Sequence, residues 1–332
     1  MTASMRAFVI TRPGGPEVLE VREVARPAPV GEQVLVRVRA SALNRADLLQ
    51  RMGRYPPPPG APADIPGIEF AGEVVELGQG AREWRVGQSV FGIVGGGAHA
   101  EYLVAHERAI AEIPTGLDWR GAAAVPEVFI TAHDALLTQA GVRPGERVLI
   151  HAVGSGVGLA AVQLARALGA TPYGTARTPD KVERARDYGL EDGVALAGDL
   201  APLTERANAW TEGRGVEVVL ELVGGDYLAA SVAALAPRGR LVLIGTMAGA
   251  RTTLDLGLVL RNRLTIRGTV LRSRPLEERI LATRAFAAEV GPLLARHVVR
   301  PVIDSVFPLA EIRAAHERLE SNATFGKVVV EV

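Results

Sequence analysis

Glycines at positions 154, 156 and 158 form the pattern with the clearest chemical meaning in this sequence. They follow the apolar residues 148–150 and precede a stretch with apolar residues at helical spacing, so we predict a strand, a tight turn and a helix. Glycine lets the backbone turn sharply and approach a ligand closely. Because the first amides of a helix attract anions, the turn suits the pyrophosphate of a dinucleotide. We expect pyrophosphate contacts from Ser155, Gly156 and Val157.

The strict G-x-G-x-x-G register falls on Val153, Ser155 and Gly158, so only its last glycine is in place. An ordinary strand-to-helix turn with several glycines is therefore the alternative interpretation. The helix after the turn is expected to bury one apolar stripe and to end at Gly169. The stripe consists of Val157, Ala161, Leu164, Ala165 and Leu168.

The end of the second predicted strand bears on which nucleotide binds. An acidic residue there favours NAD, whereas basic residues accommodate the 2′-phosphate of NADP. This chain has Arg177, Thr178 and Lys181 at that point, and an arginine and an ammonium both complement a phosphate. NADPH is the expected cofactor. The alternative is that Arg177 and Lys181 are solvated residues at a helix start, because Asp180 lies between them.

Composition limits the functions that are open to the chain. Its 332 residues are enough for two domains, and Lys plus Arg equals Asp plus Glu at 37 each, so net charge does not favour nucleic acid or membrane surfaces. Cysteine is absent, which excludes disulfides, a thiol nucleophile and cysteine-ligated metals. The six histidines lack the spacing of zinc ligands, so no metal is expected. The sequence shows no membrane-spanning run and no signal-peptide pattern, and we expect a cytoplasmic enzyme.

The patterning changes along the chain. Residues 1–125 show alternating segments and dense turn signals, which indicate a compact β-barrel-like domain. From residue 126 to 274, strand and helix patterns alternate, as in a doubly wound α/β domain with a parallel sheet. Residues 275–332 begin with a helix over 277–294 and are expected to return to the first domain. The six predicted strands of the parallel sheet lie near 147–151, 171–175, 194–196, 217–222, 240–245 and 264–269.

Together these segments resemble the zinc-independent quinone oxidoreductases, the zeta-crystallin-like group of the medium-chain dehydrogenase/reductase superfamily, over essentially the whole chain. The resemblance is strongest to the branch known in animals as the tumour-suppressor-inducible quinone oxidoreductase. It implies a GroES-like catalytic domain, residues 1–125 and 275–332, and a Rossmann NADP-binding domain, residues 126–274. The segments that carry it are Ala42-Leu-Asn-Arg-Ala-Asp-Leu48, Pro66-Gly-Ile-Glu-Phe-Ala-Gly72, Ala122-Ala-Ala-Val-Pro-Glu127, the glycine turn, Leu271-Arg-Ser-Arg274 and Gly326-Lys-Val-Val329.

Two comparisons within that superfamily refine the expectation. Zinc alcohol dehydrogenases have a catalytic cysteine where this chain has Asn44, and a histidine where it has Ile68. An alcohol needs the metal as a Lewis acid, whereas an electrophilic quinone or enone accepts hydride without it. The group often has a phosphate-contacting tyrosine beyond the second strand, and none occurs near Val194, so the phosphate contact is assigned to the basic residues named above.

Several further residues are candidates for the site, each with a structural alternative. The resemblance implies that the Asn44 amide contacts the nicotinamide ribose or a substrate oxygen, although Asn is also a common helix N-cap. Tyr55 can stack on a substrate or donate a proton, or pack on the prolines that follow it. Thr131 is placed at the start of a helix that crosses into the cofactor domain. Asn322 and Lys327 can close the site, or Lys327 is a solvated strand residue.

Ligands of open parallel sheets bind beyond the carboxyl ends of the strands. Residues there are expected to form the cofactor wall: Leu222, Gly245, Thr246, Met247, Thr269 and Leu271.

Three functions remain open from the sequence. The first is an NADPH-dependent quinone reductase that transfers hydride directly. The second is an NADPH-dependent reductase of alkenals, enones or enoyl thioesters, which for coenzyme A esters requires a basic groove. The third is an NADPH-binding RNA or regulatory module with negligible turnover, and the lack of a basic stretch counts against it. The exposed edge segment 264–270 can pair with a second copy, and the resemblance more than the segment itself implies a homodimer, with a tetramer as the alternative.

Overall fold

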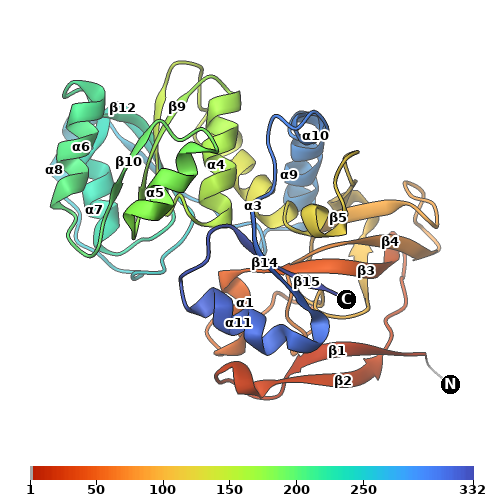
Figure 1. Ribbon diagram of the computed structural model, residues 1–332. Coiled ribbons are helices and arrows are strands. Elements are labelled where there is room, and N and C mark those ends of the chain that lie inside the picture. Colours follow the sequence, from red (N-terminus) through yellow and green to blue (C-terminus); the bar gives the residue numbers. More distant parts are fainter. Residues whose placement is uncertain (1–2) are drawn as a thin grey trace. The chain divides into compact units, whose positions relative to one another are not determined.

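A computed structural model describes residues 3–332 as two compact units (Figure 1). Unit 1 comprises the residues up to Ile130 together with Leu271–Val332, and unit 2 comprises Thr131–Val270. The domain boundaries expected from the sequence were residues 125 and 275. No helix among residues 3–332 combines the length and apolar character needed to cross a bilayer.

Unit 1 is built on a seven-stranded, mostly antiparallel sheet in the order β14-β15-β3-β4-β5-β7, with β6 also paired to β3. The C-terminal strands β14 and β15 therefore join strands from the beginning of the chain, as predicted. A separate hairpin pairs β1 with β2. The strands are β1 (Ser4–Ile10), β2 (Leu19–Ala25), β3 (Gln33–Leu43), β4 (Glu69–Leu77), β5 (Ser89–Ile93), β6 (Tyr102–His106), β7 (Ile110–Glu112), β14 (Ile303–Pro308) and β15 (Lys327–Glu331).

Alternation along the strands of unit 1 builds its cores. Val34, Val36 and Val38 of β3 pack with Phe70 and Val74 of β4 on one face. A second cluster joins Leu43 and β15 to the helix α11. The helices of this unit are α1 (Arg45–Arg51), α2 (Trp119–Ala123), α3 (Pro126–His133, which crosses the unit boundary), α9 (Leu276–Glu289), α10 (Gly291–Ala295) and α11 (Ile312–Glu320).

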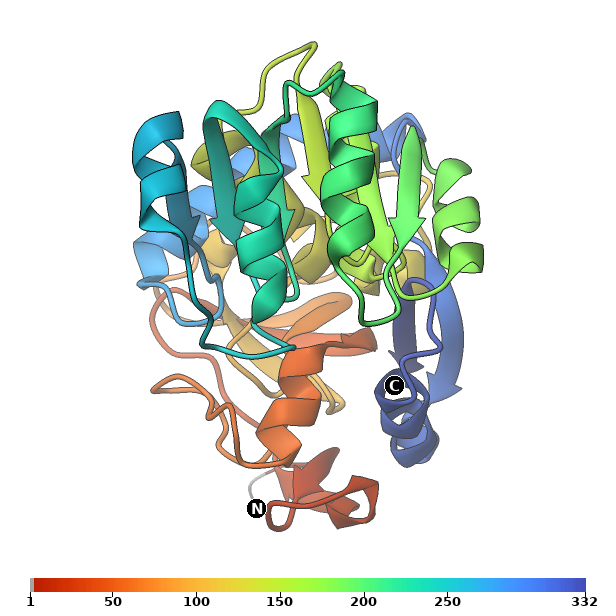
Figure 2. The same cartoon turned by 90° about the vertical axis from the view of Figure 1, so that its left-hand side faces the viewer.

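Unit 2 has a six-stranded parallel sheet in the order β10-β9-β8-β11-β12-β13, which is the doubly wound order of dinucleotide-binding domains and confirms the predicted fold class. Figure 2 shows these strands side by side with helices in front of them. The strands are β8 (Arg147–Ile150), β9 (Thr171–Ala176), β10 (Asp192–Ala195), β11 (Val216–Glu221), β12 (Leu235–Leu243) and β13 (Thr265–Gly268). The helices are α4 (Gly156–Ala167), α5 (Pro179–Arg186), α6 (Ala201–Thr211), α7 (Asp226–Ala233) and α8 (Leu256–Asn262).

Three local expectations were wrong. The helix α4 is buried over eight consecutive residues, Gly158–Ala165, rather than along one stripe, because other elements cover more than one of its sides. The helix expected over 277–294 is two helices, since Val290, Gly291 and Pro292 interrupt it. Thr131 lies near the end of α3 and not at its start, because that helix begins at Pro126, a residue well suited to a first turn.

Candidate active site

A buried ion pair joins three neighbouring strands of unit 1. The ammonium of Lys327, the first residue of β15, lies 2.6 Å from a carboxylate oxygen of Glu69, the first residue of β4. It also donates to the Leu43 carbonyl at 2.7 Å and to the Asn44 amide oxygen at 2.6 Å, at the end of β3. Lys327 is 4% exposed and Glu69 is fully buried. The alternative of a solvated strand lysine is therefore wrong.

The Asn44 side chain is held from both ends. Its amide nitrogen donates to Glu69 at 2.8 Å and to the Ala42 carbonyl at 3.3 Å, while its oxygen accepts from Lys327. Its backbone amide donates to Asp47 at 2.7 Å, so Asn44 also begins helix α1 as the capping alternative predicted. Since both amide hydrogens are used, the group left for a ligand is the second lone pair of the side-chain oxygen.

Tyr55 is half-buried, and the Arg272 guanidinium lies 5.0 Å from its ring centroid, a cation–π contact. Burial raises the pKa of the Tyr55 phenol, and the charge of Arg272 partly opposes that rise. Arg272 is buried and donates to the Gly95 carbonyl at 2.7 and 2.9 Å and to the Gln50 amide oxygen at 2.6 Å. The glycine loop 95–97 thus anchors an arginine.

Arg272 is a candidate that the sequence reasoning missed. It stood inside the segment that carried the family resemblance, but nothing in the local pattern marks one arginine of a polar loop as buried. Its buried Nη1 atom has no hydrogen-bond partner within the described part of the chain. Leu271 beside it is buried in unit 1. Asn322 follows α11 with φ 60°, and its side-chain oxygen accepts from Arg45 at 2.5 Å.

In unit 2 the glycine turn has the predicted form. β8 ends at Ile150, Ala152 has φ 51°, and α4 begins at Gly156. The Ser155 hydroxyl accepts from the Gly158 amide at 3.0 Å, which makes Ser155 the N-cap of α4. A Cβ at position 158 would lie 2.3 Å from the Ala152 carbonyl oxygen. The first turn of α4, with half-buried Ser155, Gly156 and Val157, is a helix N-terminus, which attracts anions.

A polar network fixes the backbone beneath this turn. The fully buried His151 contacts the Thr175 hydroxyl at 2.8 Å and the Ser231 hydroxyl at 2.7 Å. Ser231 donates to Glu221 at 2.6 Å, and the other Glu221 oxygen accepts from the Val223 amide at 2.8 Å. Burial lowers the pKa of His151, although Glu221 opposes the shift. The network links β8, β9, β11 and α7 at the carboxyl edge of the sheet.

The residues expected to recognise the 2′-phosphate lie at the end of β9. Arg177 and Thr178 are exposed. The Lys181 stem packs on the glycine turn, so close that a Cβ at Gly154 would lie 2.9 Å from its Cδ. A hydrogen bond with the Thr178 side chain lowers the pKa of the Asp180 carboxyl. The positive charges of Lys181 and Arg184 lower it further. The structure thus brings Lys181 to the turn, and Thr178 engages the nearby carboxylate.

The expected wall residues follow β11, β12 and β13. Leu222 and Gly245 are half-buried, whereas Thr246 and Met247 are exposed. A Cβ at Gly245 would lie 2.6 Å from the Leu222 carbonyl oxygen, so those two strand ends are in contact. The Thr269 hydroxyl donates to Asp134 at 3.1 Å. Thr131 is buried in α3. A group of three or more His, Cys, Asp or Glu able to hold a metal ion is not found among residues 3–332.

Known families and proteins match both units. The alcohol dehydrogenase GroES-like domain family matches residues 31–115, and a family described as zinc-binding dehydrogenase matches residues 187–330. A quinone oxidoreductase of Pseudomonas aeruginosa is 35% identical over 96% of both chains. The Escherichia coli quinone oxidoreductase, solved in complex with NADPH, is 29% identical with a TM-score of 0.86, covering 99% of this chain and 100% of its own. A structure described as an NAD-dependent alcohol dehydrogenase is 31% identical with the same TM-score and coverage.

A GroES-like unit together with a six-stranded Rossmann sheet defines a medium-chain dehydrogenase/reductase. Within that superfamily, the full-length similarity places the chain in the quinone oxidoreductase family, to which it belongs. The resemblance seen in the sequence is confirmed at that level, and the GroES-like and Rossmann fold class is confirmed with it.

Proposed function

We propose that this protein is an NADPH-dependent quinone oxidoreductase that works without a metal. The full-length similarity to quinone oxidoreductases carries the proposal most strongly. The E. coli relative solved with NADPH supports the choice of cofactor. Within the family we place the chain in the tumour-suppressor-inducible branch, because Ser155 and the segment 271–274 match it, and a tree built with both branches tests that placement.

The residues of unit 2 fit the cofactor. The capped first turn of α4 can receive the pyrophosphate, and the Lys181 ammonium and Arg177 can pair with the 2′-phosphate. β9 ends at Ala176, so no strand-end carboxylate is present to bind the ribose hydroxyls. Bound NADPH supplies a hydride to the acceptor. We propose that six residues of this unit form the cofactor wall: Leu222, Gly245, Thr246, Met247, Thr131 and Thr269.

The residues of unit 1 fit a flat, electron-poor acceptor. The Tyr55 ring can stack on a quinone, and the neighbouring Arg272 charge favours the negative charge that an acceptor gains with the hydride. The pKa of the phenol is raised by burial, so it remains protonated at neutral pH, and the proton comes from solvent or from Tyr55. The Asn44 oxygen, fixed by Lys327, is proposed to accept from a ribose hydroxyl. The remaining residues of unit 1 that we propose for the active site are Asn322, Leu271 and Lys327.

Stopped-flow loss of NADPH absorbance with 1,2-naphthoquinone and, separately, an alkenal tests the proposal. We expect fast quinone turnover with NADPH and much slower turnover with NADH. The double variant R177A/K181A should lose at least tenfold in kcat/KM with NADPH and little with NADH, since about 1.4 kcal/mol corresponds to tenfold. Rapid alkenal reduction without quinone turnover would identify an alkene reductase instead. Tight NADPH binding with neither turnover would support a binding module.

A further inference from the structure

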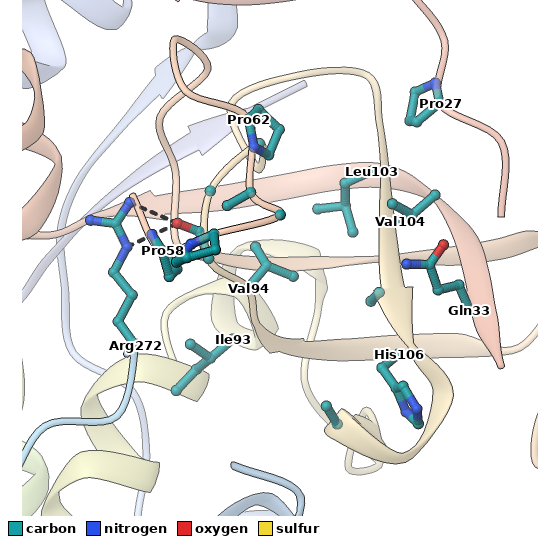
Figure 3. Close-up of a pocket in the computed structure, with 18 of the residues that line it drawn as sticks. Pro27, Gln33, Pro58, Pro62, Ile93, Val94, Leu103, Val104, His106 and Arg272 are labelled. Atoms are coloured by element: carbon teal, nitrogen blue, oxygen red, sulfur yellow. Dashed lines mark hydrogen bonds between the residues drawn. The ribbon is translucent and has the colours of Figure 1, made fainter. Parts of the chain in front are cut away.

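A cavity of about 650 Å³ on unit 1 adjoins the Tyr55 and Arg272 pair. Figure 3 shows Arg272 at one end and Gln33 and His106 at the other, with apolar strand residues between them. The glycine loop 95–97, the proline loop 58–62 and the start of α9 also line it. Its lining includes Arg272, Arg274 and Arg279 but neither aspartate nor glutamate.

Two of these arginines lack a carboxylate partner within residues 3–332. Arg272 donates to the neutral oxygens of Gly95 and Gln50, and the buried Asp47 carboxylate, whose charge raises the pKa of Arg272, accepts hydrogen bonds from the Asn44 and Gly67 amides instead. Arg279 is half-buried, and its buried Nε atom has no partner. Burial lowers the pKa of both guanidinium groups, which nevertheless stay charged. A desolvated cation without a directly hydrogen-bonded counter-ion costs free energy, and an arriving anion would recover part of that cost.

Other arginines nearby are neutralised by partners. Arg284, also on α9, pairs with Glu83 at 2.5 Å, and Arg108 pairs with Glu277 at 2.8 Å. Glu277, in the first turn of α9, is therefore engaged by Arg108 and does not line the cavity. His106 does line it and has Glu32 at 3.3 Å. The unpaired positive charge of this region thus borders the cavity.

We propose that this cavity binds a phosphate monoester, carried by the acceptor as in an enoyl thioester of coenzyme A. A phosphate dianion matches two guanidinium groups in charge, and their planar forks suit its oxygens. The inference rests on the proposed NADPH-dependent reductase activity and adds to the quinone a second acceptor class, the enoyl thioester. In that reaction NADPH and a solvent proton saturate the C=C bond, yielding the acyl thioester and NADP⁺. Inorganic phosphate is the other source of the same chemistry.

Calorimetric titration with coenzyme A and with inorganic phosphate, at saturating NADP⁺ so that the cofactor's own phosphate site is filled, tests the site directly. We expect coenzyme A to bind, and R279M to weaken that binding at least tenfold, as expected for losing about 1.4 kcal/mol. R279K should restore most of it. R284M, on the same helix but with its arginine paired, is the matched control and should change little.

Q33E is a second variant that avoids removing a packed arginine. Gln33 accepts from the Val30 amide at 3.1 Å through its side-chain oxygen, which a glutamate keeps while adding a negative charge to the cavity wall. Q33E should therefore weaken the binding of coenzyme A without lowering the thermal stability of the protein. In turnover, R279M should lower kcat/KM for crotonyl-coenzyme A at least tenfold and leave crotonaldehyde unchanged.

The outcomes separate this inference from the proposed function. Binding of phosphate that R279M weakens, without added affinity for coenzyme A, would support the anion site and assign it to free phosphate. The inference would be overturned if neither probe bound at millimolar concentration, or if R279M and Q33E left the binding unchanged. In either case the proposed quinone reductase activity would still stand. Loss of all NADPH-dependent turnover, with anion binding intact, would overturn only the proposed function.

Discussion

At the scale of single residues, Lys327 connects three strands of unit 1 through its buried ammonium. Its ammonium is saturated by Glu69, Asn44 and the Leu43 carbonyl, so K327M leaves a buried carboxylate uncompensated. We expect K327M to lower the free energy of unfolding by about 3–5 kcal/mol. Urea denaturation followed by circular dichroism measures this.

The matched control for K327M is R120M. Arg120 pairs with Glu331 at 2.6 Å, but both side chains are about half exposed, so its loss should cost at most about 1 kcal/mol. The double variant K327M/E69Q should recover part of the loss, because the carboxylate charge leaves with the ammonium. Equal losses in K327M and R120M would show that the ammonium contributes no more than a surface charge.

Tyr55 offers a second prediction at this scale. Because burial raises the pKa of the phenol above its ordinary value, Tyr55 keeps its proton throughout pH 6–9, and we expect it to act mainly by stacking on the quinone. Y55F should retain quinone turnover within about threefold with an unchanged pH profile, whereas Y55A should raise KM for the quinone. Steady-state kinetics from pH 6 to 9 measures both. A loss of 100-fold or more in kcat for Y55F would assign the phenol as the general acid.

The sequence could propose Lys327 and Asn44 as site residues but not their mutual contact. Glu69 and Lys327 are 258 positions apart, and strand pairing between distant segments brings them together. Arg272 was missed for a related reason: its acceptors, Gly95 and Gln50, lie in two loops whose meeting depends on tertiary packing. The glycine turn was predictable because the residues that form it are consecutive in the sequence.

At the scale of elements, the join between β8 and α4 has a residue that tests it. A Cβ at Gly158 would lie 2.3 Å from the Ala152 carbonyl oxygen, which is backbone and cannot move aside easily. G158A should lower the free energy of unfolding by about 1–3 kcal/mol and weaken NADPH binding, because the turn must shift. Urea denaturation and a fluorescence titration with NADPH measure the two effects.

G268A is the control for G158A, since a Cβ at position 268 meets nothing within 4 Å and Gly268 also lies in the cofactor unit. It should leave both quantities unchanged. Unaltered NADPH affinity in G158A would contradict the role of the turn in binding the pyrophosphate.

The strands of the parallel sheet were predictable because buried strands alternate with helices at regular spacing, and the structure has all six of them. The stripe expected on α4 failed for an opposite reason. Glycine and alanine are small enough to pack on any side, so Gly158 and Ala160 are buried although they fall outside the predicted apolar stripe. Composition alone does not reveal how many neighbours such a helix has.

At the scale of the whole molecule, three buried histidines predict how stability depends on pH. Burial lowers the pKa of His99, His151 and His316. The unfolded chain therefore binds protons near pH 6.5 that the native state does not, and stability falls as the pH drops below about 6.5, by up to about 1.4 kcal/mol per pH unit for each histidine. The melting temperature measured from pH 8 to 5 checks this.

The carboxylates do not account for a loss of stability between pH 6.5 and 5. The pKa values of Glu146, Glu217 and Asp304 are lowered by their hydrogen bonds to Arg240, Arg147 and Arg318, against the effect of burial. Their stabilisation is present above their unfolded pKa values near 4 and is lost only at lower pH. A flat melting temperature between pH 6.5 and 5 would contradict the neutral state of the buried histidines.

The edge of the cofactor sheet leads to the last prediction, that two copies of the chain associate. β13 is the last strand in the sheet order, all four of its residues are exposed, and its outer backbone groups can pair with another strand. Exposed apolar side chains occur in β13 and in the segments next to it in the sequence: Leu256, Leu260, Ile266 and Val270. Monomers rarely leave an apolar strand edge open, so we expect a dimer of about twice the 35.0 kDa chain mass.

The variant I266K tests this dimer. It should shift the protein to a monomer at micromolar concentration, because a lysine would be desolvated between the two edges. V21K alters a similarly exposed residue of β2 in unit 1 and should leave the dimer intact. Light scattering after gel filtration distinguishes the masses, and a wild-type monomer at 100 µM would mean that this edge is protected by its twist and short length instead.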